Sequence, residues 1–192
     1  MMELCHITFG YPGRELFRDF SLRVEPGERV ILTGASGRGK TTLLRLMAGL
    51  EVPREGAVQG IPAGGISMVF QENRLFPGLT VLENLTMAVP GAGRGELLGL
   101  LEAVGLGGEA ERLPGELSGG MARRVAIVRA AALGSSLALL DEPFAGLDGE
   151  NRRRAAQLLT ERLGGAALVA AVHHREEGEL LGAGGRLRWV EL

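Results

Sequence analysis

The sequence predicts an α/β fold built on a mainly parallel β-sheet, and three observations support this prediction. Apolar segments of strand length alternate with helical patterns through most of the 192 residues, as in domains whose helices cover a parallel sheet. A buried strand at Arg29–Thr33 leads directly into a glycine-rich turn and a helix at Thr42–Ala48. Two short alternating segments, Glu3–Phe9 and Phe20–Val24, precede it and indicate an antiparallel β piece at the N-terminal end.

The composition is ordinary for a globular protein and argues against several other classes. The 21 basic and 23 acidic residues give a net charge of −2, so we expect no general binding to nucleic acid. Cys5 is the only cysteine, which excludes an intrachain disulfide and a cysteine-bound zinc site. No basic segment precedes an apolar run, and no apolar run approaches about 18 residues, so we expect neither a signal peptide nor a membrane span.

The turn after the strand Arg29–Thr33 has the sequence of a phosphate-binding loop. Gly34–Thr41 matches the pattern G-x-x-x-x-G-K-[ST], with a strand before it and a helix after it. Glycines let the backbone curl so that its N–H groups can point at phosphate oxygens. Lys40 is expected to reach the β- and γ-phosphates and the Thr41 hydroxyl to bind Mg²⁺. The N-terminus of the following helix faces the same anion.

Further strands follow along the chain. Val52–Gly56 breaks the chain after the first helix, and Ile66–Phe70 then forms a second buried strand. Leu137–Leu140 and Ala167–Val172 are short apolar strands, and Arg186–Val190 alternates as a last strand.

The region between the second and third buried strands predicts a small helical insertion. Thr80, with Glu83 three residues later, has the pattern of a capping box and starts a helix to about Met87. Another helix covers Glu96–Val104, and no convincing strand occurs within residues 72–116.

A fourth helix opens at Leu117–Met121 and runs to about Leu133, and a charged helix covers residues 149–163. The fourth helix is predicted to bury one face and to place its arginines elsewhere. The buried face comprises Met121, Val125, Val128 and Ala132, and the arginines are Arg123, Arg124 and Arg129.

Two consecutive acids, Asp141 and Glu142, end the strand Leu137–Leu140, and Pro143 stops it. A carboxylate at this point is the second half of a nucleotide hydrolase site, because it can assist the Mg²⁺ ion. Neighbouring residues of a strand point in opposite directions, but at the strand's end Glu142 can turn toward the γ-phosphate and position water. The alternative is a pair of solvated carboxylates.

Seven features follow one another along the chain: Tyr11, the phosphate-binding loop, Gln71, Leu117–Met121, Leu139–Pro143, Ala145–Asp148 and His173. Their order closely resembles that of the ATP-binding subunit of ABC transporters. The resemblance spans residues 3 to about 191. It implies a P-loop NTPase fold in one ABC-type ATPase domain, residues 1–192, with a helical subdomain inserted at about residues 72–134.

The resemblance also implies roles for individual residues. The phosphates of ATP would be held by Gly34, Ala35, Ser36, Gly37, Arg38, Gly39, Lys40, Thr41 and Thr42. Mg²⁺ would be bound by Thr41, Gln71 and Asp141. Catalysis would depend on Glu142 as general base, on His173 at the γ-phosphate and on Gln71 at the attacking water. The ATP of a second subunit would meet Ser118, Gly119 and Gly120, with Asp148 at the same interface.

Some of these assignments have alternatives. Tyr11 would stack on adenine, or else it is a surface residue of a turn. Gln71 on its own would be a polar residue at a strand end. His174 stands where the family usually has an aspartate, so both His173 and His174 are candidates for the contact with the γ-phosphate.

The partners implied by the resemblance are a separate transmembrane permease, a second copy of the chain or a paralogous ATPase, and a substrate-binding protein. Such a subunit works at the cytoplasmic, inner face of the cell membrane. Gln71–Pro77 resembles the corresponding loop of nitrate, sulfonate and taurine importers, and we expect the permease to dock near Gln71 and residues 72–87.

Only 19 residues follow His173, so we expect no C-terminal regulatory domain. The alternatives are a soluble ABC-type ATPase not coupled to transport and a nucleotide-binding regulator without turnover.

Overall fold

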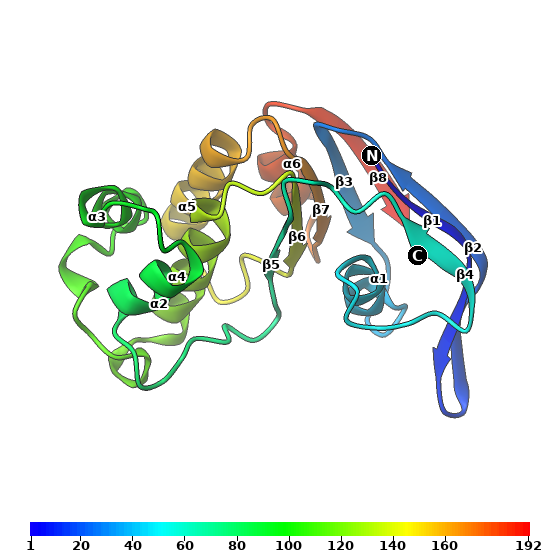
Figure 1. Ribbon diagram of the computed structural model, residues 1–192, viewed down its shortest axis with the longest axis horizontal. Coiled ribbons are helices and arrows are strands. Elements are labelled where there is room, and N and C mark those ends of the chain that lie inside the picture. The colour runs from blue at the N-terminus through cyan, green and yellow to red at the C-terminus, as the bar shows by residue number, and fades with distance from the viewer.

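The computed structural model describes residues 1–192, and its strands form two separate sheets (Figure 1). The smaller sheet is antiparallel, in the order β2-β1-β4, and the larger is parallel throughout, in the order β5-β6-β7-β3-β8. The predicted fold class is therefore confirmed. The strands are β1 (Met2–Tyr11), β2 (Arg14–Val24), β3 (Glu28–Thr33), β4 (Glu55–Gln59), β5 (Ile66–Val69), β6 (Leu137–Asp141), β7 (Ala167–Ala171) and β8 (Arg186–Glu191).

The helices lie on both sides of the parallel sheet. In Figure 1, α1 and the antiparallel sheet lie on one side, while α2, α3, α4 and α5 lie on the other. None of the helices is both long and apolar enough to cross a membrane. The helices are α1 (Lys40–Met47), α2 (Val81–Ala88), α3 (Arg94–Ala103), α4 (Gly119–Ala132), α5 (Gly149–Arg162) and α6 (Arg175–Gly182), with short 3₁₀ turns at Gly107–Glu109 and Pro114–Glu116.

Alternation along the central strands divides the apolar core between the two faces of the sheet. Val30 and Leu32 of β3 belong to the cluster shared with α1 and the antiparallel sheet. Ile31, between them, belongs to the cluster that also contains apolar residues of α2, α3, α4 and α5. Strands β6 and β7 divide in the same way, as expected of parallel strands that are covered on both faces.

One strand was missed by the sequence analysis. Strand β4 begins at Glu55, inside the chain break expected at Val52–Gly56, and pairs with β1. It has five residues and is largely exposed, so no apolar alternation marked it. Gly56 makes the pairing possible, since it has φ of +83° and any Cβ there would lie 2.3 Å from the Cys5 carbonyl oxygen.

The helix predicted from Thr80 has the expected N-terminus. The Thr80 hydroxyl accepts a hydrogen bond from the Glu83 N–H at 3.2 Å, and the Glu83 carboxylate accepts one from the Thr80 N–H at 2.7 Å. Both halves of the capping box are formed, because the motif depends only on residues three positions apart.

Helix α4 differs from its predicted amphipathic pattern. Arg123 and Arg124 are only 2% and 9% exposed, so the expectation that they lie away from the buried face was wrong. Burial lowers the pKa of the Arg123 guanidinium, while the carboxylates of Asp141 and Glu142 oppose this change. The guanidinium groups can be buried because they donate hydrogen bonds to main-chain carbonyls.

Arg29 on β3 is a third buried arginine, but fewer of its N–H groups are hydrogen-bonded. It is fully buried, and its Nη2 donates to the Leu163 carbonyl oxygen at 2.8 Å, but its Nε and Nη1 have no hydrogen-bond partner. Burial also lowers the pKa of Arg29. The site therefore carries the cost of unsatisfied buried donors.

We expect Arg29→Met to raise the free energy of unfolding by about 1–3 kcal/mol, because an apolar chain of similar length removes those donors. Urea denaturation of both proteins measures the difference. The matched control is Arg186→Met on the neighbouring strand β8, where Arg186 is exposed and a change within about 0.5 kcal/mol is expected. If Arg29→Met instead lowers the free energy of unfolding, then other interactions must offset the cost of burying the Arg29 guanidinium.

Candidate active site

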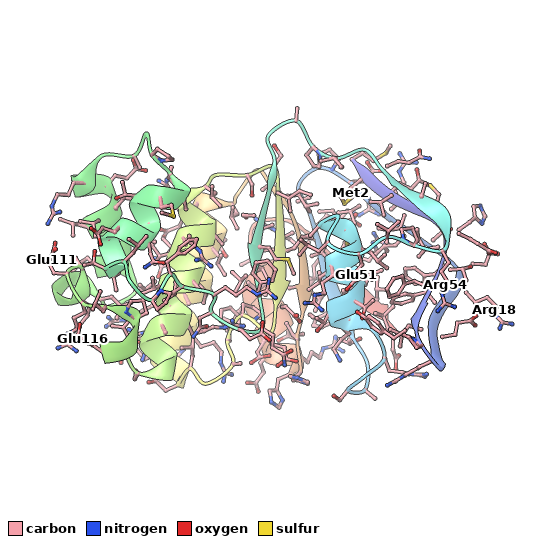
Figure 2. All side chains as sticks on the ribbon, turned by 60° about the horizontal axis from the view of Figure 1, so that its bottom comes forward. Met2, Arg18, Glu51, Arg54, Glu111 and Glu116 are labelled. Atoms are coloured by element: carbon pink, nitrogen blue, oxygen red, sulfur yellow. The ribbon has the colours of Figure 1, made fainter.

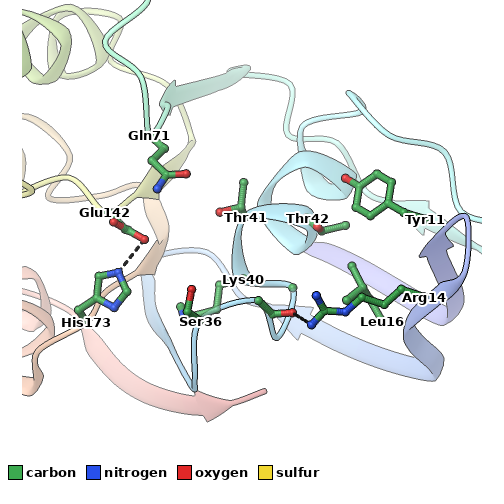
Figure 3. Close-up of a pocket in the computed structure, with 12 residues that line it drawn as sticks. Tyr11, Arg14, Leu16, Ser36, Lys40, Thr41, Thr42, Gln71, Glu142 and His173 are labelled. Carbon is green, nitrogen blue, oxygen red and sulfur yellow. Dashed lines mark hydrogen bonds and ion pairs between the residues drawn. The ribbon is translucent and has the colours of Figure 1, made fainter.

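The predicted motifs meet around one cavity of about 290 Å³ (Figure 3). Strands β5, β6, β7 and β3 are neighbours in the parallel sheet, so the segments after them meet at its carboxyl edge. Gln71, Glu142, His173 and the phosphate-binding loop follow these strands in that order. The cavity is lined by Tyr11, Arg14, Leu16, Ser36, Gly37, Gly39, Lys40, Thr41, Thr42, Gln71, Glu142 and His173.

The glycines of the phosphate-binding loop occupy conformations that other residues rarely adopt. Gly34, Gly37 and Gly39 have φ of +130°, +78° and +99°. A Cβ at Gly39 would lie 2.8 Å from the Phe17 ring, and one at Gly37 would lie 3.1 Å from the Arg14 guanidinium. The loop can therefore curl closely against the β1–β2 hairpin only without these side chains. This leaves a backbone cradle of the kind that binds anions.

Lys40 lies under this cradle at the start of α1. It is 6% exposed, and its Nζ donates to the carbonyl oxygens of Gly34 at 2.7 Å and Ala35 at 3.3 Å. A buried ammonium group at a helix N-terminus makes the cradle strongly attractive to phosphate.

Thr41 and Asp141 place two potential oxygen ligands next to each other. The Thr41 hydroxyl donates to Asp141 Oδ1 at 3.1 Å, and Asp141 is 1% exposed. Burial raises the pKa of Asp141; the Thr41 hydrogen bond opposes this, and the Glu142 carboxylate adds to it. A hydroxyl and a desolvated carboxylate this close suit a hard cation such as Mg²⁺, which prefers oxygen ligands and keeps some of its water. Gln71 lines the same cavity.

Glu142 turns into the cavity through an uncommon backbone conformation. Its φ is +47°, in the left-handed region that glutamate rarely occupies. Glu142 Oε1 lies 2.7 Å from His173 Nε2, as Figure 3 shows. Residues held in such conformations cluster at active sites, and this one lets two consecutive acids serve the same site.

The structure separates the two candidate histidines. His173 lines the cavity, whereas His174 does not. His174 instead begins α6, where its N–H lies 3.4 Å from Glu177 Oε2. His173 is therefore the histidine that the fold brings to Glu142.

The tip of the β1–β2 hairpin forms the other end of the cavity. Tyr11 and Arg14 face each other across a two-residue turn, and Tyr11 is the last residue of β1 rather than part of the turn. The Tyr11 hydroxyl donates to Glu51 Oε1 at 3.3 Å. Arg14 Nη2 donates to the Gly37 carbonyl oxygen at 2.5 Å. Arg14 and Leu16 also line the cavity and were not predicted, because their only signal was their closeness to Tyr11 across the hairpin.

Eight predicted site residues do not line this cavity. Gly34, Ala35 and the exposed Arg38 belong to the phosphate-binding loop, and the buried Asp141 reaches the site only through Thr41. The other four lie elsewhere: Ser118, Gly119, Gly120 and Asp148. Ser118 caps α4, its Oγ accepting from the Met121 N–H at 3.2 Å, and Asp148 caps α5, its Oδ1 accepting from the Asn151 N–H at 2.9 Å. The Asn151 hydrogen bonds lower the pKa of Asp148. Gly120 lies close to Gly146, since a Cβ on it would be 3.3 Å from the Gly146 carbonyl oxygen. These residues therefore form a second exposed surface with two helix N-termini.

Fold and cavity together define a P-loop nucleotide-binding protein, and comparison with known proteins gives its family. The family model described as ABC transporter matches residues 17–145. The aliphatic sulfonates import ATP-binding protein SsuB 1 of Pseudomonas fluorescens is 43% identical over 183 residues, covering 94% of this chain and 70% of that protein. The Fe(3+) ions import ATP-binding protein FbpC of Brucella melitensis is 45% identical over 177 residues, covering 83% and 50%. This chain belongs to the ABC transporter family.

Solved structures agree with this assignment. The dimeric structure of MJ0796, described as a bacterial ABC transporter cassette, superposes with a TM-score of 0.85 at 29% identity, covering 100% of this chain and 94% of that one. The post-hydrolysis state of the same cassette, bound to ADP and Pi, gives 0.83 at 28% identity and covers 100% and 96%. The chain spans 70% of the length of the sulfonate relative and 50% of the iron relative.

Proposed function

We propose that this chain is the ATP-binding and ATP-hydrolysing subunit of an importer, and that it powers transport through a separate membrane permease. The observation that carries the proposal is the meeting of the phosphate-binding loop, the Thr41–Asp141 pair and the Glu142–His173 pair around one cavity. The names of the relatives support import: they are described as import ATP-binding proteins for sulfonates and for Fe(3+).

In this proposal the cavity holds ATP along its length. Tyr11 stacks on the base at the hairpin end, and residues 34–42 hold the phosphates. Thr41, Asp141 and Gln71 would hold Mg²⁺, which would neutralise charge on the phosphate oxygens. The Glu142 carboxylate accepts the proton of the attacking water, and His173, which contacts Glu142 Oε1, orients that carboxylate beside the γ-phosphate.

A second subunit completes the site in this proposal. Ser118, Gly119 and Gly120 precede α4 outside the chain's own cavity, so their helix N-terminus is available to the ATP of another copy or of a paralogous ATPase. Asp148 lies on the same surface. The MJ0796 cassette, which is described as dimeric, supports such an arrangement.

The permease has a candidate docking groove. A hollow of about 420 Å³ lies between the C-terminal end of α1, the parallel sheet and the helical insertion, and most of its lining is apolar. Leu50 and Phe76 are 52% and 51% exposed there, whereas Val81 and Leu82, which lie within the expected docking stretch 72–87, are buried. A helix of a membrane protein on the inner face of the cell membrane fits such a groove. A soluble ABC-type ATPase not coupled to transport is the alternative, and it needs no such partner.

The test co-expresses the chain with a multi-spanning membrane protein chosen from the genes next to its own. In a Cys5→Ser background, Phe76→Cys should crosslink to that protein and Mg-ATP should be hydrolysed by the complex. The control, Arg18→Cys, lies at the opposite end of the molecule from the helical insertion (Figure 2) and should not crosslink. Crosslinks that avoid the groove would reject this docking site, and hydrolysis unaffected by the membrane protein would favour the soluble alternative.

A further inference from the structure

Arg123 of α4 holds the main chain directly after β6. Its Nε donates to the Pro143 carbonyl oxygen at 3.0 Å, and its Nη2 donates to that of Asp141 at 2.7 Å and also to that of Glu142. Three consecutive carbonyl groups therefore point at one guanidinium. They surround the left-handed conformation of Glu142, whose N–H donates to the Ala171 carbonyl oxygen at 3.0 Å.

The other side of the same guanidinium holds the segment after β5. Arg123 Nη1 donates to the carbonyl oxygen of Phe70, and its longer contacts are to the Gln71 carbonyl oxygen at 3.3 Å and to Asn73 Oδ1 at 3.4 Å. All three guanidinium nitrogens are thus in use, and Arg123 is 2% exposed. One rigid, planar group on the helical insertion side binds both segments that carry Gln71 and Glu142 into the cavity.

A guanidinium in this position couples the two segments, since its donors have a fixed fork geometry. A shift of the Gln71 segment moves the plane of the group and therefore the Asp141 and Glu142 carbonyls. Glu142 depends on such support, because a glutamate keeps a φ of +47° only where contacts with the surrounding structure hold it there.

We propose that Arg123 is a positioning residue that sets the backbone of Gln71 and Glu142 jointly, so that ATP hydrolysis depends on it and ATP binding does not. This inference rests on the proposed function for the identity of the reaction. Arg123 does not line the cavity, so it acts only through the two segments that it holds.

The experiment compares Arg123→Gln and Arg123→Lys with the unmodified chain. For Arg123→Gln we expect kcat for Mg-ATP to fall about 100-fold, as misplacement of a catalytic group by about 1 Å can cause, with the Kd for ATP changed less than about threefold. Arg123→Lys keeps the charge but cannot bind both segments, so an intermediate kcat is expected. Without nucleotide, hydrogen exchange of residues 70–74 and 140–146 should accelerate together in Arg123→Gln.

Arg129→Gln is the matched control. Arg129 lies on the same helix and donates to the carbonyl oxygens of Asn73 and Arg74 at 3.1 and 2.7 Å, without a hydrogen bond to residues 141–143. Its replacement should speed exchange of residues 70–74 only and leave kcat within about threefold. An equal loss of kcat in Arg129→Gln would overturn the proposal. Anchoring of the segment after β5 alone would then explain the loss, without any joint positioning of Gln71 and Glu142.

Two further outcomes distinguish the inference from the proposed function. If Arg123→Gln folds with normal kcat and normal exchange, the positioning role is rejected, and Arg123→Lys provides the same comparison if Arg123→Gln does not fold. In the Glu142→Gln background, Arg123→Gln should lower the residual kcat little further, because residues that act as a unit are not additive. A chain that shows the joint change in exchange but no ATP hydrolysis would reject the proposed function and support the coupling.

Discussion

Lys40→Ala should lower the affinity for ATP by at least about 100-fold. Lys40 supplies a buried ammonium group at the phosphate-binding loop and also binds the carbonyl groups of Gly34 and Ala35. Its removal takes away the charge that faces the phosphates and frees two carbonyls of the loop, and loss of a buried charged partner typically costs several kcal/mol. Isothermal titration with ATP in the presence of Mg²⁺ measures the change.

The control for this prediction is Arg18→Ala, which removes the same charge from an exposed residue paired with Glu15 at 2.8 Å. Its affinity for ATP should match that of the unmodified chain. If Lys40→Ala binds ATP equally well, residues 34–42 are not the phosphate site, whatever their match to the motif.

Glu142→Gln should reduce ATP hydrolysis by about 10²–10⁴-fold while ATP remains bound, because the amide keeps the size of the side chain but cannot accept the proton of water. The bound ATP should then hold two copies together through the surface at Ser118 and Asp148. Phosphate release measures the first effect. Size-exclusion chromatography in Mg-ATP and again in Mg-ADP measures the second, with a dimer expected only in Mg-ATP.

Glu176→Gln is a suitable control, because Glu176 is an exposed residue in the first turn of α6 that does not line the cavity. It should hydrolyse ATP normally. A Glu142→Gln protein that dimerises equally in both nucleotides would contradict the proposed role of ATP as the link between subunits. Normal hydrolysis by Glu142→Gln would assign the base to another residue.

Features set by local sequence could be predicted well. The phosphate-binding loop, the strand that ends at Asp141 and the capping box at Thr80 each depend on residues within a few positions of one another. Strand β4 could not be predicted, because it is short and largely exposed and its partner is β1, about fifty positions earlier. Local pattern specifies a strand only where a face is buried.

The same distinction explains the site. The order of the motifs indicated which residues meet, but the roles of Arg14 and Arg123 depend on contacts that only the folded chain forms. Arg14 reaches Gly37 through the hairpin, and the carbonyls around Arg123 come from segments up to 53 positions away. An arginine on a helix is usually exposed, so no pattern in α4 could have placed Arg123 inside.

The division of the core between the two faces of the sheet has a consequence for how the chain unfolds. Strands β3, β6 and β7 each give alternate side chains to both apolar clusters. Loosening one cluster therefore withdraws support from the strands that the other needs, and neither side melts alone. This cooperativity extends to the carboxyl edge, where the loop after β3 and the acids at the end of β6 keep their relative positions only while both clusters are intact. Local fluctuations are then expected in the polar loops and not in the sheet strands that these loops connect.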